Sequence, residues 1–502
     1  MKKLFLISFS FILLKPIYAQ QRGDIVSFDS LQFYNATDFG AEVQQIIGFP
    51  PSILGIEYDF KVYRVLYYTQ DYHPDSLTIA SALVTIPANY PCNELGLFSY
   101  GHGLSLKDDG VPSNNYSNNG YSLICKGIAS NGFIGAAPDY IHMSQWSSPG
   151  PQAFIHARTE ANCTVDLFRA IRQYCAQRNI QLSGQIFLSG YSQGGNGTVA
   201  AAKYMQEQYA GEFTVTAACA GGGSYDLSGI CADSLSSIHR VTPERHSLPL
   251  VIRSLAVVYE DSLIAWNTGI NRFNVIDTVF KAPYRTQLHA LLDRTDPFGD
   301  NSFLDSIPAR MIVDSLLFGF QTDPNHFFRR LLADNDIDDW SPQMPLVLFH
   351  SDIDIENPYQ NAVNTLQLFQ QNGAPDVTLY TVQGFTHPAA GQPHALYTLQ
   401  LMKTKRVDCL TSSIGESFSS ETVSMNIYPN PAMDVIHLSF ESGSGANTFN
   451  SVKIFNTTLQ LMTEQSVGSS ASIDISYLPL GTYLLSAENT TGKKFFRLFS
   501  KQ

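Results

Sequence analysis

The chain has 502 residues and a formal net charge of −13, with 44% hydrophobic and 15% charged residues. This length exceeds what one hydrophobic core organises, so we expect at least two domains. The composition is that of a folded, well-buried protein. The acidic charge argues against nucleic-acid binding, because contacts to phosphates need clustered lysine and arginine.

Residues 1–19 have the layout of a secretory signal peptide. Two lysines precede an apolar run at residues 4–14, and the small residue Ala19 follows at a distance suited to cleavage. A membrane anchor would need about 20 apolar residues, and a lysine and a proline end this run earlier. We therefore expect an exported protein, secreted or held at the cell surface.

After a polar lead, residues 21–90 contain two strand-like stretches, FKVYRVLYYT and LTIASALVTIP. Their alternating and β-branched residues predict an antiparallel edge of a larger sheet. From residue 95 onward, short apolar runs alternate with helical segments such as residues 157–177. The apolar runs are LGLFSY, FIGAAPDY, QIFLSG, FTVTAACA and PLVLFH. This alternation predicts the α/β class, with a mostly parallel sheet covered by helices on both faces.

The alternation lapses between about residues 225 and 340, where amphipathic helices are expected. Such an insertion would form a cap over the carboxyl edge of the sheet. Residues 410–424 are serine-rich and poor in large apolar residues, which is typical of a linker. Residues 425–502 contain short alternating strands such as VIHLSF and TYLLSA. They predict a small β-sandwich domain after an α/β domain of residues 20–409.

Disulfides can form in an exported protein, and this chain has seven cysteines. They are Cys92, Cys125, Cys163, Cys175, Cys219, Cys231 and Cys409. A local bond between Cys219 and Cys231 is possible, but the connectivity stays open, and an odd number leaves one cysteine over. None has the Cys/His spacing of a zinc site, and we expect neither a metal nor another cofactor.

The stretch SGYSQGG places three glycines around Ser192. It follows an apolar strand and precedes an alanine-rich helix, so G-x-S-x-G lies at a strand-to-helix turn. A serine at the tip of so sharp a turn adopts an unfavourable backbone conformation, and small neighbours prevent collisions. The helix N-terminus also favours developing negative charge. Because the bare motif often arises by chance, the predicted nucleophile depends on this context and on its partners.

A serine nucleophile needs a base, and the base needs an acid that orients it. HSDIDIENPY follows one apolar strand and offers two acids, Asp352 and Asp354. QGFTHPAAG follows the next strand and presents His387 on a loop. All three groups reach the same edge of the sheet in the order Ser, Asp, His. We expect His394 to begin the next helix and to be structural.

Acyl transfer also needs hydrogen-bond donors for the oxyanion. LFSYGHGLSL follows another predicted strand and carries His-Gly at residues 102–103. By position, the backbone N–H groups of Leu104 and Gln193 are the expected donors. A flexible turn is the other interpretation of GHG, and a complete triad disfavours it.

Six motifs together resemble the α/β-hydrolases of the secretory lipase type: YGHGLS, APDYIHMSQW, GYSQGGNG, CAGGGSYDL, HSDIDIENPY and GFTHPAA. The resemblance covers roughly residues 50–405. It implies a serine hydrolase that cleaves carboxylic esters through an acyl-enzyme. Carried over, Ser192 is the nucleophile, Asp354 the orienting acid and His387 the general base.

The related H-G-x-x-D-x-x-V-P pattern aligns with HSDIDIENP and favours Asp354 over Asp352. The chain departs from this pattern at Ser351 and Asn357, where the family often has glycine and valine. These departures concern the geometry of the loop around the acid.

The tail resembles the C-terminal sorting domain of type IX secretion in certain Gram-negative bacteria. The residues that carry this resemblance are IYPNPAMDVIHLSF, IDISYLPLGTYLL and KKFFRLFSKQ. It implies an outer-membrane export machine as a partner, beside a small-molecule ester or lipid substrate. A carbohydrate-binding or adhesive sandwich is the alternative.

Two other functions are compatible with the motifs. A serine peptidase of the prolyl-peptidase kind shares the elbow, but such enzymes usually carry a propeller of several hundred residues before the core. Residues 20–94 are far too few for one. A catalytically silent surface protein could also retain the fold, although an intact triad disfavours it.

Overall fold

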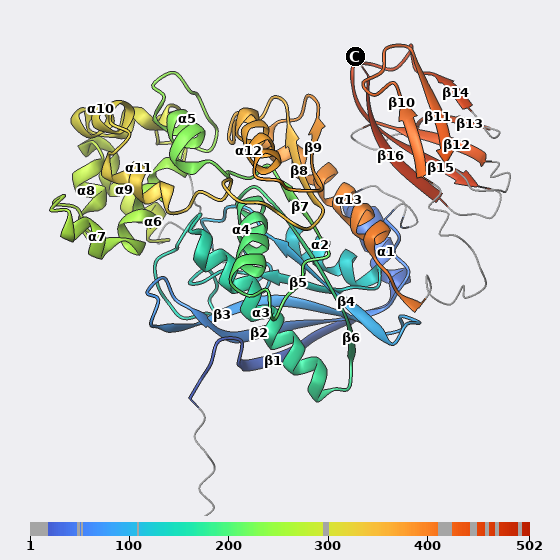
Figure 1. Ribbon diagram of the computed structural model, residues 1–502, viewed down its shortest axis with the longest axis horizontal. Helices are drawn as coiled ribbons and strands as arrows, with labels where there is room; N and C mark the ends of the chain where they lie inside the picture. The colour runs from blue at the N-terminus through green and yellow to red at the C-terminus, as the bar shows by residue number, and fades with distance from the viewer. Residues whose placement is uncertain are drawn as a thin grey trace, which may run out of the picture.

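The largest element of the computed structural model is a nine-stranded sheet (Figure 1). The structure describes residues 19–47, 51, 54–107, 110–294, 301–409, 424–441, 449–456, 461–466, 471–489 and 494–501. The expected signal peptide and linker therefore lie almost entirely outside the described residues.

The strand order of this sheet is β1-β2-β3-β5-β4-β6-β7-β8-β9. The bounds are β1 Ile25–Tyr34, β2 Phe60–Gln70, β3 Leu77–Pro87, β4 Glu94–Gly101, β5 Ile134–Pro138, β6 Gln181–Tyr191, β7 Ala217–Gly221, β8 Leu346–Ser351 and β9 Val377–Val382. Neighbours from β1 to β5 in this order pair antiparallel, and all pairs from β5 to β9 are parallel. The expected α/β class with an antiparallel edge is confirmed.

The outermost strand, β1, comes from the segment that the sequence presented as a polar lead. The ring of Phe28 in this strand stacks on the ring of Tyr174, with 3.7 Å between the two ring centroids. Most of its other side chains are half-buried or exposed. Six of its ten residues are apolar, but register shifts between Ile25 and Ser27 and between Ser30 and Gln32 break the alternation that would mark a strand in the sequence.

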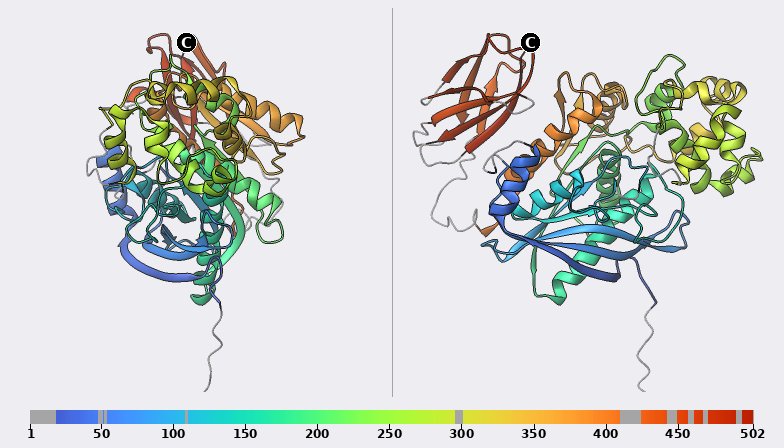
Figure 2. Two further views of the ribbon diagram at one scale, coloured as in Figure 1. Left: turned by 90° about the vertical axis from the view of Figure 1, so that its left-hand side faces the viewer. Right: turned by 180° about the vertical axis from the view of Figure 1, so that it is seen from behind.

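Helices cover both faces of the sheet (Figures 1 and 2). One face carries α1 Ala36–Ile47, α2 Gly120–Ser130 and α13 His387–Lys405. The other carries α3 Ala157–Gln177, α4 Gln193–Glu207 and α12 Tyr359–Gln371. No helix in the described part of the chain is long and apolar enough to cross a membrane.

A helical cap is inserted between β7 and β8. It contains the turns η2 Leu227–Cys231 and η3 Pro308–Met311, and the helices α5 Ala232–Ser236, α6 Ser247–Val258, α7 Glu260–Ala265, α8 Val275–Val279, α9 Ala282–Leu292, α10 Asp314–Thr322 and α11 Phe327–Ala333. The cap has a core of its own, in which Val251 and Leu255 of α6 pack with Phe320 and Phe328. The helices expected in this region are therefore present.

The C-terminal strands form two small antiparallel sheets, β10-β11-β14 and β13-β12-β15-β16. Their bounds are β10 Ser424–Tyr428, β11 Val435–Glu441, β12 Phe449–Phe455, β13 Leu461–Gln465, β14 Ala471–Asp474, β15 Gly481–Asn489 and β16 Lys494–Lys501. Ile436 and Leu438 of one sheet share a buried core with Ile454 and Leu485 of the other. This is the expected sandwich.

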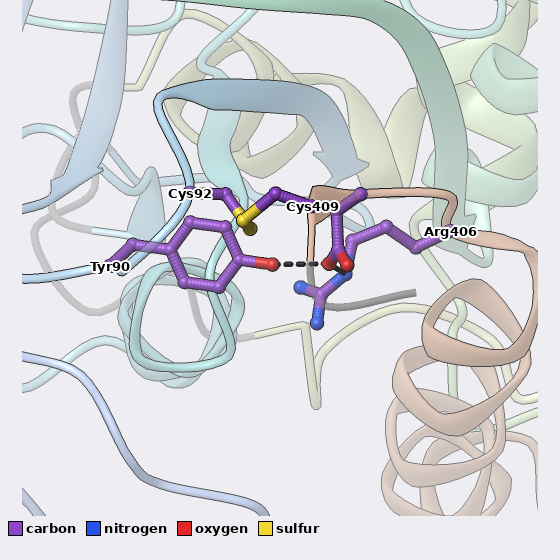
Figure 3. Close-up of a disulfide and its surroundings, with 5 residues drawn as sticks. Tyr90, Cys92, Arg406 and Cys409 are labelled. Carbon is purple, nitrogen blue, oxygen red and sulfur yellow. Dashed lines mark hydrogen bonds and ion pairs between the residues drawn. A yellow bond between two sulfur atoms is a disulfide. The ribbon is translucent and has the colours of Figure 1, made fainter. Parts of the chain in front are cut away.

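A disulfide joins Cys92, after β3, to Cys409, after α13 (Figure 3). Beside it the hydroxyl of Tyr90 donates to the carboxylate of Asp408, which also pairs with Arg406 Nε at 2.8 Å. The five remaining cysteines, Cys125, Cys163, Cys175, Cys219 and Cys231, are buried and free.

The local disulfide between Cys219 and Cys231, which the sequence left possible, is therefore not formed. Cys219 is in β7 and packs in the core under α13, whereas Cys231 packs in the core of the cap. Their proximity in sequence is misleading because the chain leaves the sheet between them.

Candidate active site

Ser192 lies at the tip of the turn between β6 and α4. Its φ of 60° and ψ of −118° lie outside the regions that L-residues favour. Its N–H donates to the carbonyl of Gly221 at 2.8 Å, and its own carbonyl accepts the N–H groups of Gly195 and Asn196 at 2.9 and 3.2 Å. The strained conformation is thus held from both sides, in the strand-turn-helix context of a nucleophile elbow.

Glycines let other backbone segments approach this turn closely. A Cβ on Gly194 would lie 2.0 Å from the carbonyl oxygen of Gly101 at the end of β4, and a Cβ on Gly190 would lie 2.4 Å from the carbonyl oxygen of Gly194. A Cβ on Gly195 would lie 2.3 Å from the carbonyl oxygen of Gly221 in β7. Any side chain at these positions would force the backbone of the elbow away from β4 or β7.

The structure brings His387 and Asp354 to Ser192 at the carboxyl edge of the sheet. His387 Nε2 lies 2.8 Å from Ser192 Oγ, and His387 Nδ1 lies 2.6 Å from Asp354 Oδ2. The three groups follow β6, β8 and β9, respectively. A hydroxyl, an imidazole and a carboxylate in one hydrogen-bonded chain can move a proton off the serine.

His387 is the first residue of α13 rather than part of a loop, and His394 lies inside the helix rather than at its start. Both expectations were wrong: the helix begins before Pro388, which its first turn tolerates because the first N–H groups of a helix need no partner within it. His394 is buried against Tyr100, whose hydroxyl lies 3.1 Å from Nδ1, and burial lowers the pKa of His394 to about 3. It does not reach Ser192.

Electrostatics favour an ionised acid beside a basic imidazole. Burial favours neutral Asp354, but hydrogen bonds from His350 and His387 outweigh it and hold the pKa of Asp354 well below its usual range. Its Oδ1 also accepts the N–H groups of Glu356 and Asn357, each at 2.9 Å. Burial lowers the pKa of His387, but the Asp354 carboxylate raises it more, so the pKa lies above its ordinary value.

The other candidate acid, Asp352, is exposed and accepts the N–H of Gly384 at 2.8 Å. Asp352 makes no hydrogen bond or ion pair with His387, whereas Asp354 makes both. Ser351 and Asn357, which depart from the family pattern, hold the loop in place. Ser351 Oγ donates to the carbonyl of Phe385 at 2.6 Å, and Asn357 Nδ2 donates to the carbonyl of Gly222 at 2.6 Å.

The loop after β4 passes beside the elbow. A Cβ on Gly103 would lie 3.5 Å from Ser192 Cβ. Leu104, Gln193 and Ser192 line one small cavity of about 50 Å³. Both residues expected to supply oxyanion donors therefore border the space beside Ser192.

Glu160 is a fully buried acid behind the elbow that the sequence interpretation missed. Its Oε1 accepts hydrogen bonds from the side-chain amide of Gln193 at 2.8 Å and from the N–H of Ile155 at 3.0 Å. Burial raises the pKa of Glu160 to about 8, so this carboxyl is mostly neutral at pH 7. An acid in the first turn of a helix is common, so no sequence signal marks it.

Glu244 and His350 were also missed. Glu244 comes from the cap and lines the same cavities as Ser192, and burial raises its pKa. His350 is buried, with Nε2 2.8 Å from the carbonyl of Asn357 and 3.4 Å from Asp354 Oδ2. For His350 the signal was available, because it begins the HSDID motif.

Two segments of the chain match known families. Residues 121–236 match the secretory lipase family, and residues 426–500 match the secretion system C-terminal sorting domain. The protein is a carboxylic ester hydrolase. Both resemblances expected from the sequence are thereby confirmed. The sorting domain indicates that the hydrolase is exported, either secreted or retained at the cell surface, and implies an interaction with the secretion machinery.

Solved structures share the fold of the hydrolase. A rice cell wall degrading esterase, LipA from Xanthomonas oryzae, is 22% identical and has a TM-score of 0.65, and the match covers 77% of this chain and 100% of that one. Lipase A of Candida antarctica in its closed state is 18% identical with a TM-score of 0.57, over 77% of this chain and 82% of that one. No curated protein matches the sequence.

Proposed function

We propose that the hydrolase is a serine esterase or lipase in which Ser192, His387 and Asp354 form the catalytic triad. The observation that carries the proposal is the unbroken chain of contacts from Ser192 Oγ through His387 to Asp354 Oδ2, at 2.8 and 2.6 Å. The low pKa of the acid and the raised pKa of the imidazole suit their roles as orienting carboxylate and general base.

In the first half of the reaction, Ser192 Oγ attacks the ester carbonyl carbon while His387 Nε2 takes the hydroxyl proton. The backbone N–H groups of Leu104 and Gln193 stabilise the oxyanion of the tetrahedral intermediate. The protonated imidazole, held by Asp354, then gives its proton to the leaving alcohol oxygen. The products are the free alcohol and an acyl-enzyme.

In the second half, His387 Nε2 takes a proton from water, and the water oxygen attacks the acyl carbonyl. Collapse of the second intermediate returns the proton to Ser192 Oγ and releases the carboxylic acid. The balance is one ester and one water consumed for one alcohol and one acid.

We further propose the domain division of residues 1–19 as signal peptide, 20–409 as catalytic domain, 410–424 as linker and 425–502 as sorting domain. The partner of the sorting domain would be the outer-membrane export machine. The peptidase alternative has no support in the fold, because residues 25–87 supply β1 to β3 of the main sheet and α1 instead of a propeller.

The test is turnover of p-nitrophenyl butyrate by the wild type and by Ser192→Ala, together with labelling by a fluorophosphonate probe. We expect kcat to fall at least about 10³-fold in the variant, and the label to map to Ser192. Ser183→Ala, at the far end of β6, is the matched control and keeps the wild-type rate. Activity retained by Ser192→Ala would overturn the triad, and faster cleavage of a glycyl-prolyl p-nitroanilide would favour a peptidase.

A further inference from the structure

A segment of the cap, residues 240–244, lies against the loop that carries Asp354. The segment belongs to the connection between α5 and α6, and the loop, residues 352–358, connects β8 to α12. Arg240 and Thr242 bind the loop, whereas Val241 and Pro243 are exposed. Alternate side chains of the segment therefore face the loop, although the two parts of the chain are 115 positions apart at the first of these contacts.

The guanidinium of Arg240 binds two successive backbone carbonyls of this loop. Its Nε donates to the carbonyl of Ile355 at 2.9 Å, and its Nη2 donates to the carbonyl of Glu356 at 2.6 Å. The two donors belong to one rigid, planar group, so together they fix the orientation of both peptide groups. The side chain is only 13% exposed, and it carries its charge at neutral pH because arginine does not deprotonate there.

The same two peptide groups hold the carboxylate of Asp354. The N–H of Glu356 shares a peptide group with the carbonyl of Ile355, and the N–H of Asn357 shares one with the carbonyl of Glu356. Both N–H groups donate to Asp354 Oδ1 at 2.9 Å. Since each peptide group is planar and rigid, Arg240 on the carbonyl side fixes the N–H on the Asp354 side. Hydrogen bonds in such a chain also polarise one another, so the positive charge strengthens the donors to the carboxylate.

Apolar packing contributes little to the position of this loop. The side chains of Ile353 and Ile355 are 49% and 53% exposed. Polar contacts must hold the loop instead, and the cap supplies two more of them. Thr242 Oγ1 donates to Glu356 Oε2, and Arg240 Nη2 lies 3.4 Å from the same oxygen. The cap thus holds both the main chain and the side chain of Glu356.

We propose that Arg240 is a positioning residue for the triad, which holds the two peptide groups that bind Asp354 and so keeps this carboxylate aligned with His387. The inference rests on the proposed function, in which Asp354 orients His387. Arg240 acts through Asp354 and not on the ester, so its loss should affect the chemical step more than substrate binding. A displacement of about 1 Å in a catalytic group can lower a rate about 10²-fold.

The experiment measures kcat and KM for p-nitrophenyl butyrate in the wild type, Arg240→Ala, Arg240→Lys and Asp354→Asn. Arg245→Ala is the matched control. Arg245 Nη1 also donates to two backbone carbonyls, those of Ser302 and Leu304 at 2.8 and 2.9 Å, but both belong to the cap. The assay of Arg240→Ala is repeated with methylguanidinium chloride, whose cation has the shape of the missing group, and with methylammonium chloride at the same concentration.

We expect Arg240→Ala to lower kcat about 10²-fold and to change KM less than about threefold. Methylguanidinium should raise the kcat of this variant at least about tenfold, and methylammonium should not, because only the former has the planar pair of donors. Arg240→Lys keeps the charge but not that pair, so its kcat should fall about tenfold, and it provides the test if Arg240→Ala does not fold. Arg245→Ala should keep the wild-type kcat.

A wild-type kcat in the folded Arg240 variants, or an equal loss in Arg245→Ala, would overturn the positioning role and leave the proposed triad intact. A loss in Arg240→Ala that methylguanidinium does not reverse would also overturn it, since the guanidinium would then matter only for the packing of the cap. A wild-type kcat in Asp354→Asn would instead overturn the proposed triad.

Discussion

The side-chain amide of Gln193 donates to Glu160 Oε1 at 2.8 Å, directly behind the nucleophile turn. Gln193 is the first residue of α4 and the expected source of one oxyanion donor, whereas Glu160 belongs to the first turn of α3. This contact couples the two helices that meet under the elbow. It also places a carboxyl where water cannot reach it.

The first prediction concerns the pH dependence of stability. Burial raises the pKa of Glu160 from 4.5 to about 8, so the folded state favours the neutral acid. This contribution to stability is fully present below pH 4.5 and is lost as the pH rises through about 8. Its size is on the order of a few kcal/mol.

Urea unfolding of the wild type and Glu160→Gln between pH 5 and 9 measures this effect. We expect the wild type to lose unfolding free energy relative to Glu160→Gln as the pH rises, because glutamine stays neutral. Glu207→Gln, on the exposed side of α4, is the control, and its free energy of unfolding should change with pH as that of the wild type does. Parallel curves for the wild type and Glu160→Gln would show that the carboxyl does not titrate in this range.

The second prediction distinguishes the two aspartates that follow β8. Only Asp354 bonds to His387 Nδ1 within the described residues, whereas Asp352 is exposed and bonds to Gly384. Asp354→Asn should lower kcat by about 10⁴-fold, since an amide neither fixes the required tautomer nor stabilises the imidazolium. Asp352→Asn should stay near the wild-type rate. The kcat of each variant is measured with p-nitrophenyl butyrate. An equal loss of kcat in the two variants would contradict the proposal that Asp354 orients His387.

Much of the fold was predictable because its signals are local. The helix at residues 157–177 is long and amphipathic, and its bounds agree with α3. The parallel strands contain short apolar runs, such as LGLF in β4, IFL in β6 and LVLF in β8, as buried strands require. By contrast, β1 was hidden because two register shifts break its alternation of apolar and polar residues.

The site was predictable only in part, since some of its relationships exist only in three dimensions. The H-G-x-x-D-x-x-V-P pattern favours Asp354 over Asp352, but it does not specify the loop hydrogen bonds that hold the Asp354 carboxylate, such as those from the N–H groups of Glu356 and Asn357. The contact between Glu160 and Gln193 joins residues 33 positions apart. This contact leaves no pattern in the sequence.

The third prediction concerns the pH profile of catalysis. His387 must be neutral to act as a base, so kcat/KM falls as the pH drops through its pKa, which lies above the ordinary value of 6.5. After Asp354, the charge of Glu244 is the next group that raises this pKa. Glu244→Gln should therefore move the acidic limb of the profile to lower pH.

Profiles of kcat/KM between pH 4 and 9 for the wild type, Glu244→Gln and Glu94→Gln provide the comparison. Glu94 is an exposed glutamate at the start of β4, so its variant should reproduce the wild-type profile. A shift of the Glu244→Gln profile to higher pH would contradict the sign of this electrostatic effect.

The last prediction concerns the disulfide. Cys92 and Cys409 are separated by 317 residues, and the bond fastens the segment after α13 to the segment after β3. Because α13 begins with His387, anchoring its far end also restrains the helix that carries the proposed base. Closing so long a loop stabilises the folded state by about 2–4 kcal/mol.

The double variant Cys92→Ser/Cys409→Ser should show that loss in its free energy of unfolding by urea. Dithiothreitol should lower the free energy of unfolding of the wild type to the same value. The double variant itself should not respond to the reductant, since the five other cysteines are free and buried. A wild type whose stability is unaffected by reduction would show that the bond adds nothing to the fold.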